Sequence, residues 1–576
     1  MKLVIAEKPS VAKSIAKVLG ANAYKNGYYE GNSYKVSWCY GHLVQLAAPD
    51  EYDKKYSKWK INDLPIIPND YKYNVAQGTA KKQFMVLKEL LTDKFVDSVV
   101  NACDAGREGE SIFRLVYMKA KSKKPIERLW ISSLEDTAIR EGFKNLQPGS
   151  KFENLNKAAQ ARNIADWLVG MNLSRLYTCL YKDKFSVGRV QTPSLAMIAQ
   201  RDMEIKNFQK EKYYTVKLEL NNFTMESGRI DEKQEAVKLV KDLQNIKVIR
   251  LNSLTEKQKV SKPDKLYDLT TLQREANKKY GFTAQKTLDC LQSLYEKKLT
   301  TYPRTDSRYL TDDMQDKARK LLVGLDENCK IDQQNFLKIF DSTKVSDHYA
   351  VIPTLSSIYA DFSKMEITED EERIYEMVKL KLLAACSANL IENITTAVYK
   401  HGVYEFTAVG KIVEQEGFTV YSKVQTKDKM LPKLSQNEEY TIQNAELEEK
   451  FTQPKKHYTE DTLLKAMETA GVSAYDKNIE IERKGLGTPA TRAGIIETLI
   501  NRELVMRDKK QLICTAKGYR LITVVANKFK SAELTAEWEN QLARIAKGEF
   551  SYKQFLADIS REITELVDKY QNTLSE

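Results

Sequence analysis

Two turns of this sequence carry acidic side chains of the kind that bind a divalent cation. Glu7 and Lys8 share one turn, and Asp104, Glu108 and Glu110 share another, which also contains two glycines. If the turns are neighbours, their carboxylates converge, and a cation such as Mg²⁺ beside phosphates would relieve the repulsion. The competing interpretation is a solvated acidic loop with Glu110 at a helix start, and spacing alone slightly favours it. The glycines favour the metal site, because they let the turn approach a ligand closely.

A tyrosine-containing segment at residues 300–307 could supply a nucleophile. Pro303 biases Tyr302 toward extended backbone, in which Tyr302 and Arg304 would point to the same face. The guanidinium of Arg304 could then hold a phosphate while the phenol oxygen attacks it. Because the chain contains 31 tyrosines, chance explains such a pair more simply when the segment is considered alone.

Two further segments begin with glycine and lead into predicted helices, at residues 188–193 and 485–492. In the second, Thr488 is the expected N-cap and Pro489 the first helical residue. Such helix starts can bind phosphates, although ordinary capping explains them equally well. His348, one of only four histidines, lies before a Pro-Thr turn, and a lone histidine is more often structural than catalytic.

The elements that must position these residues are strand–turn–helix units. Residues 3–6 form an apolar run typical of a buried parallel strand, and an amphipathic helix from Pro9 should end at Gly20. A second strand at 96–102 leads through the acidic turn into another helix. Repeated units of this kind predict an α/β domain with a mostly parallel sheet, whose ligands bind beyond the carboxyl ends of the strands.

The remainder of the chain alternates between helical and strand patterns. Two helices are expected within 268–300, the second starting near Thr283, and the tail from 458 is helical apart from a hairpin near 505–514. Both regions show a helix leading into a short strand, as in winged-helix modules. Strands are expected at residues 215–220, 246–251, 395–399, 406–409 and 440–442.

Composition restricts the classes of protein that fit. The 576 residues suggest roughly four domains. Lys and Arg number 91 against 79 for Asp and Glu, and this net charge of +12 favours a polyanionic partner such as nucleic acid.

Seven scattered cysteines without a C-x-x-C pair indicate reduced thiols and no zinc ribbon, as in a cytoplasmic protein. No signal peptide or membrane span is expected. Residues 106–111 lack the ending of a phosphate-binding loop, so ATP use has no support.

Taken together, these segments resemble the type IA DNA topoisomerase family, most closely its bacterial topoisomerase III branch. The similarity follows family order through residues 3–10, 38–43, 104–110, 186–193, 302–307, 347–354, 487–492 and 534–539. One such motif would be weak, but all of them in order are very specific.

The resemblance implies a multidomain α/β plus α+β fold, in which four domains form a toroidal core. The expected domains are an amino-terminal Toprim α/β domain (1–152), a helical DNA-binding domain (153–212 and 451–576), a β-rich arch (213–270 and 394–450) and a winged-helix-like domain carrying the catalytic tyrosine (271–393).

The resemblance also implies roles for individual residues. Tyr302 would form a 5′-phosphotyrosine link, Arg304 would bind the same phosphate, and Lys8 would steady it or donate a proton to the leaving 3′ oxygen. His348 would help to hold the active site and DNA. Mg²⁺ would be bound by Glu7, Asp104 and Glu108. The expected contacts to single-stranded DNA are Arg162, Arg189, Gln191, Thr192, Thr488 and Arg492.

The expected protein is thus an ATP-independent, monomeric DNA topoisomerase of the bacterial cytoplasm, associated with the nucleoid or a plasmid. Gly106 replaces an aspartate found in many relatives and implies a weaker or singly occupied metal site. No basic insertion of the decatenation-loop type is evident between 215 and 275. The alternatives are another Toprim enzyme, such as a primase or nuclease, and a non-enzymatic single-strand binding protein. A tyrosine recombinase fits less well, because its Arg and His set does not surround Tyr302.

Overall fold

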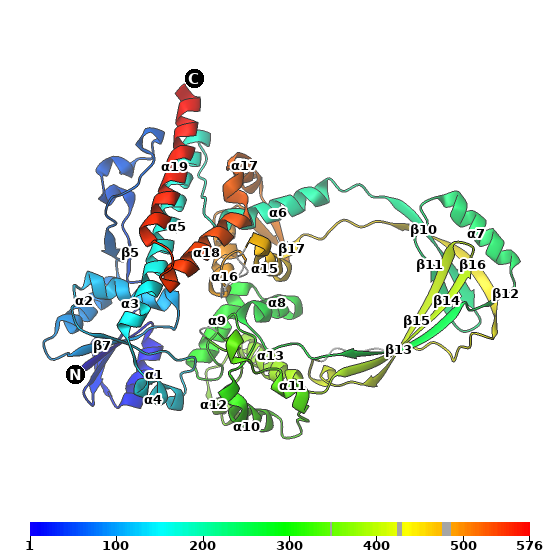
Figure 1. Cartoon of the computed structure of the whole chain (residues 1–576), viewed down its shortest axis with the longest axis horizontal. Helices are drawn as coiled ribbons and strands as arrows, with labels where there is room; N and C mark the ends of the chain where they lie inside the picture. Colours follow the sequence, from blue (N-terminus) through cyan, green and yellow to red (C-terminus); the bar gives the residue numbers. More distant parts are fainter. Residues whose placement is uncertain (346–347, 423–428, 475–484, 576) are drawn as a thin grey trace.

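The computed structural model describes residues 1–345, 348–422, 429–474 and 485–575 (Figure 1). Its amino-terminal unit is built on a seven-stranded sheet of order β2-β3-β4-β1-β7-β8-β9. The two predicted strands, β1 (Lys2–Ala6) and β7 (Ser98–Ala102), are parallel neighbours, as expected. The other strands are β2 (Ala23–Lys25), β3 (Tyr28–Gly31), β4 (Tyr34–Trp38), β8 (Ile126–Arg128) and β9 (Gln147–Pro148).

Helices cover both faces of this sheet because β1 is apolar on both sides. Leu3 and Ile5 pack with α2 (Thr79–Thr92) and α3 (Arg107–Lys119). Val4 and Ala6 pack with α1 (Pro9–Leu19) and α4 (Asp136–Lys144) on the opposite face. Gly20 adopts the left-handed conformation that ends α1, as the sequence predicts. The result is a three-layer α/β unit whose parallel strands end at one edge.

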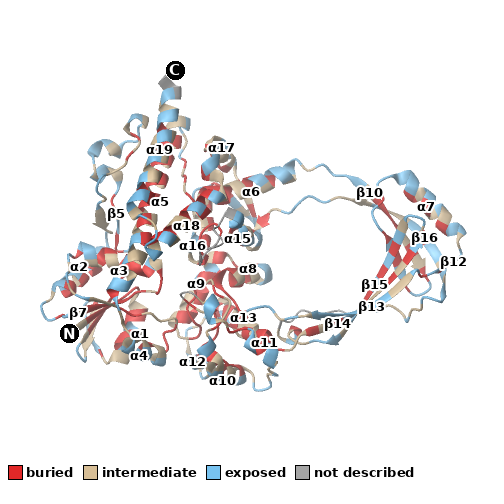
Figure 2. Cartoon of the chain, viewed as in Figure 1, coloured by how far each residue is buried: buried red, intermediate tan, exposed pale blue. Residues whose placement is uncertain are grey.

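The longest helix, α5 (Glu153–Tyr181), leads into a second, largely helical unit. Its other helices are α6 (Gln191–Lys206), α15 (Glu460–Thr469), α16 (Pro489–Asn501), α17 (Ala516–Val524), α18 (Ala532–Lys547) and α19 (Tyr552–Ser575). The predicted hairpin is present as β18 (Val505–Asp508) and β19 (Gln511–Cys514), and β17 (Tyr458–Thr459) joins β19. The inward sides of α5, α18 and α19 are buried (Figure 2).

An arch is formed by a second seven-stranded sheet, entirely antiparallel, of order β12-β16-β10-β11-β15-β14-β13. Its core includes the apolar face of α7 (Lys233–Asn245). Segments from two directions join the arch to the rest of the molecule, so that the trace closes into a ring (Figure 1). The strands are β10 (Lys212–Leu220), β11 (Thr224–Ser227), β12 (Val248–Arg250), β13 (Ser253–Ser261), β14 (Leu390–His401), β15 (Tyr404–Gln415) and β16 (Glu439–Phe451). The short helix α14 (Thr419–Ser422) follows β15.

The segment that contains Tyr302 belongs to a central helical unit. Its two predicted helices are present, and Thr283 caps the second through its side chain. After α9 (Ala284–Glu296), the expected short strand near Thr300 is reduced to an isolated bridge between Thr300 and Pro353. The helices are α8 (Leu269–Tyr280), α9 (Ala284–Glu296), α10 (Gln315–Leu325), α11 (Gln333–Leu337), α12 (Leu355–Ile358) and α13 (Glu369–Ala385).

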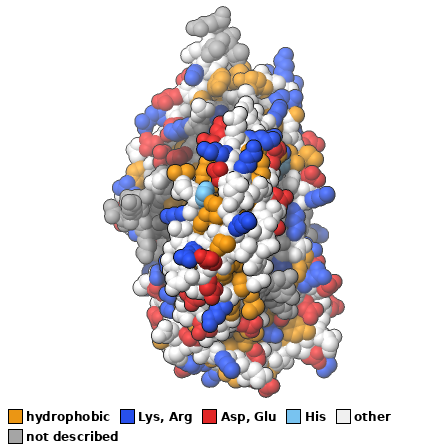
Figure 3. Space-filling model, turned by 90° about the vertical axis from the view of Figure 1, so that its right-hand side faces the viewer, with side chains coloured by type: hydrophobic (Ala, Val, Ile, Leu, Met, Phe, Trp, Pro, Cys, Tyr) orange, Lys and Arg blue, Asp and Glu red, His pale blue; other side chains and the backbone are white. Residues whose placement is uncertain are grey.

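The surface is charged and mixed. On the arch side, basic and acidic side chains are interspersed, so the positive excess of the chain does not gather on this face (Figure 3). None of the helices in the described part of the chain combines the length and the apolar character needed to cross a membrane.

Candidate active site

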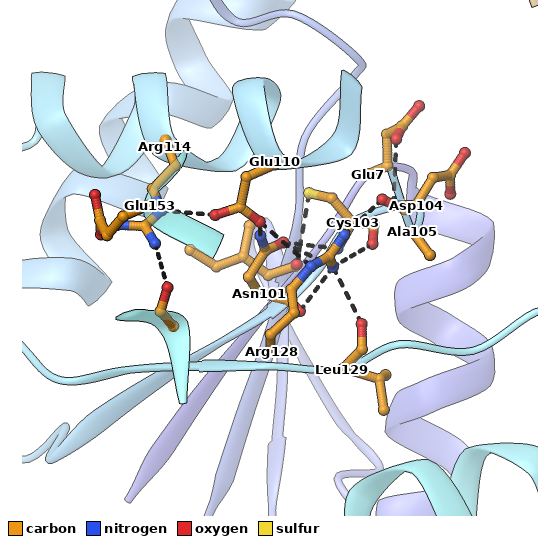
Figure 4. Close-up of polar contacts among 12 residues, drawn as sticks. Glu7, Asn101, Cys103, Asp104, Ala105, Glu110, Arg114, Arg128, Leu129 and Glu153 are labelled. Carbon is orange, nitrogen blue, oxygen red and sulfur yellow. Dashed lines mark hydrogen bonds and ion pairs between the residues drawn. The ribbon is translucent and has the colours of Figure 1, made fainter. Parts of the chain in front are cut away.

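The two acidic turns meet where β1 and β7 end, as the sequence predicts. The backbone N–H of Asp104 donates to Glu7 Oε2 over 3.3 Å (Figure 4). Two glycines make this geometry possible. Gly106 has φ +134°, and a Cβ added to Gly109 would lie 2.0 Å from the backbone oxygen of Asp104. The turn is therefore folded back tightly on itself and brings Asp104 against Glu7.

Glu7 is a buried carboxyl in an acidic environment. Burial, together with the neighbouring Asp104, raises its pKa to about 8, although Arg304 and Lys8 lower it in part. Ionising Glu7 therefore requires more positive charge than the protein itself places around it.

Tyr302 reaches this acidic edge from the central helical unit. Its hydroxyl donates to Asp104 Oδ2 over 2.7 Å, although the residues lie 198 positions apart in the chain. Burial raises the pKa of Tyr302 well above its ordinary value, and the charges of Asp104 and Glu7 add to this effect, so the phenol is protonated. Its ring packs against His348, with 4.1 Å between the ring centroids.

His348 ties the central helical unit to the amino-terminal sheet. Its Nδ1 lies 2.8 Å from Ser132 Oγ, and its Nε2 lies 3.0 Å from the backbone oxygen of Ala105, inside the acidic turn. A carbonyl only accepts, so Nε2 carries a proton and donates it to Ala105. Asp347, in the same predicted segment, lies outside the described residues.

A cavity of about 640 Å³ opens beside the acidic residues. It is lined by three of the predicted catalytic residues, Glu7, Lys8 and Arg304, and by the predicted metal ligand Glu108. Arg304 Nε is buried without a hydrogen-bond partner in the described part of the chain, a feature expected of a group that binds a ligand.

Two residues that sequence reasoning did not single out also line this cavity. His42 Nε2 lies 2.5 Å from Glu108 Oε1, and this hydrogen bond lowers the pKa of Glu108. Glu296, at the end of α9, lies 3.5 Å from Lys8 Nζ. His42 follows β4, another parallel neighbour of β1. Its position after a parallel strand is the feature of the sequence that could have identified it as a site residue. Glu296 gave no comparable signal, because it reaches the site only through packing between units.

The acidic residues fit a hard divalent cation. Glu7 and Glu108 line the cavity, and Asp104 lies against Glu7. Burial and the charge of Asp104 raise the pKa of Glu7, so a cation beside it would favour its ionised form. In the described residues, however, no three His, Cys, Asp or Glu side chains are gathered closely enough for a complete ligand set. Asp104 bonds Tyr302 and Glu108 bonds His42, so binding a cation requires these two carboxylates to turn toward Glu7.

Glu110 does not join this group, and the expectation that its carboxylate converges with the others is wrong. It is buried beneath α3, where Oε1 pairs with Arg114 at 2.7 Å and Oε2 accepts from Asn101 at 2.9 Å (Figure 4). Arg128, also buried, lies 3.3 Å from Glu110 and donates to the backbone oxygens of Cys103 and Asp104. Glu110 therefore stabilises the acidic turn through its contacts with Asn101 and Arg128.

The predicted DNA contacts divide into two groups. Arg162, Arg189 and Gln191 line a groove of about 990 Å³ along α5, although the side chain of Arg189 is almost fully buried in ion pairs. Its basic lining residues, Arg162, Arg175, Lys184, Arg189, Arg502 and Lys517, outnumber its acidic ones, Asp166 and Glu503.

The second group does not line this groove. The Thr192 hydroxyl accepts from the N–H of Gly188, and Thr488 forms a capping box with Thr491. Arg492 is buried and donates to the backbone oxygen of Leu486 and to Thr270 Oγ1. All three side chains therefore bond within the protein. For Thr488, this agrees with the interpretation of this segment as an ordinary helix cap.

Known proteins share both the sequence and the fold. A family model described as DNA topoisomerase matches residues 150–557, and a Toprim domain model matches residues 2–134. The chain is 39% identical to DNA topoisomerase 3 of Bacillus licheniformis over 97% of this chain and 80% of the relative. It is 37% identical to DNA topoisomerase 3 of Bacillus subtilis over 99% and 82%, respectively. The structure of full-length topoisomerase I from Thermotoga maritima superposes with a TM-score of 0.76 at 25% identity, over 98% of this chain and 90% of that one.

Proposed function

The chain belongs to the type IA DNA topoisomerase family, and we propose that it cuts one DNA strand with Tyr302 and reseals it in the manner of a bacterial topoisomerase III. One observation carries this proposal: the Tyr302 hydroxyl lies 2.7 Å from Asp104, beside Glu7, although the residues come from different units of the fold. A nucleophile and an acidic site that must separate for strand passage are expected to meet at such an interface.

The surrounding side chains supply what phosphodiester attack requires. The phenolic proton of Tyr302 already has an acceptor in Asp104, and the buried guanidinium of Arg304 can bind the phosphate and stabilise its developing charge. Lys8 lines the same cavity and can steady the phosphate or protonate the leaving 3′ oxygen. His348 holds the Tyr302 ring in place. The covalent link conserves the energy of the broken bond, so resealing needs no ATP.

We propose Mg²⁺ as the divalent cation, held by Glu7, Asp104 and Glu108. When bound it supplies positive charge beside the phosphate. The side chains of the protein would then bind and orient the strand, and the ionised Glu7 would be stabilised by the charge that it otherwise lacks.

The groove along α5 is the proposed path of a single DNA strand toward the cavity. Its excess of basic side chains matches a phosphate backbone, with Arg162, Arg189 and Gln191 as contacts. Trp59 also lines the groove, half exposed, and stacks on Arg175 with 5.1 Å to the ring centroid. We propose that Thr192, Thr488 and Arg492 hold the walls of the groove in place, since their side chains are engaged inside the protein.

The proposed division of the chain follows these roles. The Toprim domain would comprise residues 1–152, the arch 213–270 and 394–450, and the Tyr302 domain 271–393. The DNA-binding domain would comprise 153–212 and 451–576. Leu64 and Ile66 pack into the core of the helical unit, which ties the Toprim domain to the DNA-binding domain. We propose that the chain acts as a monomer on bacterial chromosomal or plasmid DNA.

The decisive experiment traps the protein–DNA adduct with denaturant. Tyr302→Phe is expected to abolish the adduct and the relaxation of negatively supercoiled DNA, because the nucleophilic oxygen is gone, while single-strand binding changes little. Tyr295→Phe serves as a matched control, since that ring packs on Tyr302 at 5.5 Å without contacting Asp104 through a hydrogen bond. Relaxation by Tyr302→Phe would refute the assignment. A Toprim nuclease or primase would cut or copy DNA without an adduct.

Removal of the metal separates two halves of the reaction. With a chelator present, resealing is expected to fall more than cutting, so that adducts accumulate relative to relaxed product. The reason is that realigning the 3′ oxygen with the phosphotyrosine requires the charge at Glu7 and Asp104 to be neutralised. The measurement compares adduct and relaxed product with Mg²⁺ and with chelator. Normal relaxation without any divalent cation would contradict the proposed site.

A further inference from the structure

A buried carboxylate on α18, Glu539, takes no part in the chemistry described above but contacts both functional regions. Its Oε2 accepts from Nη1 and Nη2 of Arg107, each over 3.2 Å, across 432 positions of the chain. Its Oε1 accepts from Arg189 Nη1, also over 3.2 Å. Arg107 immediately precedes Glu108 in the acidic turn, and Arg189 lines the basic groove. One carboxylate thus bridges the turn and the groove, with one oxygen for each.

A third arginine shares this carboxylate electrostatically. Burial alone would raise the pKa of Glu539, but Arg107, Arg162 and Arg189 hold it well below its ordinary range. Arg162 lies 3.8 Å from Asp166, which also pairs with Arg189 at 3.0 Å. Three guanidinium groups therefore share the two carboxylates Glu539 and Asp166, and Arg162 also acts on Glu108.

The face of α18 that carries Glu539 also fixes the orientation of Arg189. The Arg189 guanidinium stacks over Trp538 at 5.3 Å from the ring centroid, and the Thr535 hydroxyl donates to the backbone oxygen of Arg189 over 3.1 Å. Thr535, Trp538 and Glu539 lie on one side of the helix, since residues three and four apart are neighbours. The contact is therefore a rigid junction between α18, the groove and the acidic turn.

We propose that Glu539 is a positioning residue: by holding Arg107 and Arg189 together, it fixes the backbone of the acidic turn, from which Glu108 turns to bind the divalent cation, and aligns the turn with the strand in the groove. This inference rests on the proposed function for the identity of the site. Arg107 is the first residue of α3, so its contact with Glu539 fixes the backbone from which the Glu108 carboxylate turns toward Glu7. Loss of the partner leaves that backbone unfixed, and a ligand on an unfixed backbone binds a cation more weakly.

Glu539 contacts the acidic turn directly through Arg107, so its removal should change metal affinity as the loss of a residue that positions a metal ligand does, by about tenfold or more. A purely electrostatic role predicts a different pattern. Removing one negative charge beside three arginines would then tighten single-strand binding. Glu539→Gln would also weaken Mg²⁺ binding while Arg107→Gln would strengthen it, because the two substitutions change the local charge with opposite signs. The two accounts can therefore be separated without an activity assay.

The test measures Mg²⁺ affinity of the full chain by calorimetry in the absence of DNA. Glu539→Gln and Arg107→Gln are each expected to weaken Mg²⁺ binding about tenfold. The double variant is expected to be no weaker than either single variant, because both remove one contact. Glu533→Gln is the matched control at the exposed start of the same helix, where Glu533 contacts Ser531, and it should leave Mg²⁺ binding unchanged.

The outcomes are decisive. Mg²⁺ affinity within twofold of the parent in both single variants, or losses that add in the double variant, would overturn the inference. If Glu539→Gln fails to fold, as judged by its thermal transition, Arg107→Gln still tests the same contact, because Arg107 is partly exposed at the edge of the junction. Failure of the proposed function is distinguishable: the parent chain itself would then form no Tyr302 adduct with DNA.

Discussion

At the scale of single residues, Glu7 sets how the active site responds to pH. Its pKa of about 8 lies above the ordinary value of 4.5, mainly because the carboxyl is buried. A carboxyl raised in this way contributes stability that is complete below the unfolded pKa and is lost as pH rises through the folded pKa. The metal-free chain should therefore lose this contribution between pH 4.5 and about 8.

Glu7→Gln tests this dependence, since glutamine cannot ionise. In the presence of a chelator, the Tm of the variant relative to the parent is expected to rise by a few degrees between pH 5 and pH 9. Glu565→Gln, an exposed position on α19, serves as the control and should show no such trend. A Tm difference that stays constant with pH would show that the charge on Glu7 carries no cost in the folded protein.

At the scale of elements, the acidic turn between β7 and α3 depends on Gly109. An added Cβ would meet the backbone oxygen of Asp104 at 2.0 Å, and a backbone atom cannot move aside as the end of a side chain does. Gly109→Ala is therefore expected to displace Asp104 and reduce the rate of adduct formation at least tenfold, with helix content preserved. Adduct yield and circular dichroism measure the two effects.

Gly494→Ala is the matched control for this substitution, because Gly494 lies within α16 and an added Cβ there meets nothing within 4 Å. Replacing a helical glycine in open space stabilises a helix by up to about 1 kcal/mol. Equal adduct yields from Gly109→Ala and Gly494→Ala would contradict the proposed dependence on the shape of the turn.

The same elements show what a sequence can and cannot predict here. The apolar runs of β1 and β7 predicted strands of a mostly parallel sheet, in which Glu7 and Asp104 would meet if the two strands were neighbours. The pairing of β1 with β7 fulfils that condition. The burial of Glu110 could not be predicted, because it depends on which side of α3 faces Asn101 and Arg128. The residue pattern of the turn does not specify which side of α3 faces these two residues, because the packing of the helix determines it.

The helix starts illustrate the same limit. The pattern at 485–492 predicted both capping and phosphate binding, and the hydroxyl of Thr488 is used for the cap. The partnership of Arg107 with Glu539 spans 432 positions, and no local pattern encodes it. The contact of Tyr302 with the acidic edge was expected from the resemblance to a family. The residue types at 300–307 alone did not predict it.

At the scale of the whole molecule, residues 132–136 of the amino-terminal unit add to the contacts of Asp104, Ala105 and Lys8 that close the ring. The backbone oxygen of Ser132 accepts from the N–H of Tyr302 over 3.3 Å. Glu135 pairs with Lys317 at 2.6 Å, and Asp136 pairs with Lys298 at 2.7 Å. Strand passage requires Tyr302 to leave the acidic edge, so these contacts must break whenever the ring opens between the two units.

The two ion pairs lie away from the reacting atoms, and their removal should change opening without abolishing cutting. Partly exposed pairs contribute about 0.2–1 kcal/mol each. Lys298→Met combined with Lys317→Met is therefore expected to raise the ratio of open to closed rings about fivefold, which corresponds to about 1 kcal/mol. Fluorophores placed on α4 and α10 would report the opening, and an oligonucleotide assay would report the adduct.

The control for this prediction is Lys364→Met, which removes an exposed pair with Asp361 inside the central helical unit and should leave the ratio unchanged. Salt provides an independent check, because screening weakens the same pairs. Raising the ionic strength should therefore open the parent ring more than the ring of the double variant, which has already lost both pairs. If the double variant and the parent open to the same extent at low salt, closure depends on the Tyr302, His348 and Ser132 contacts alone.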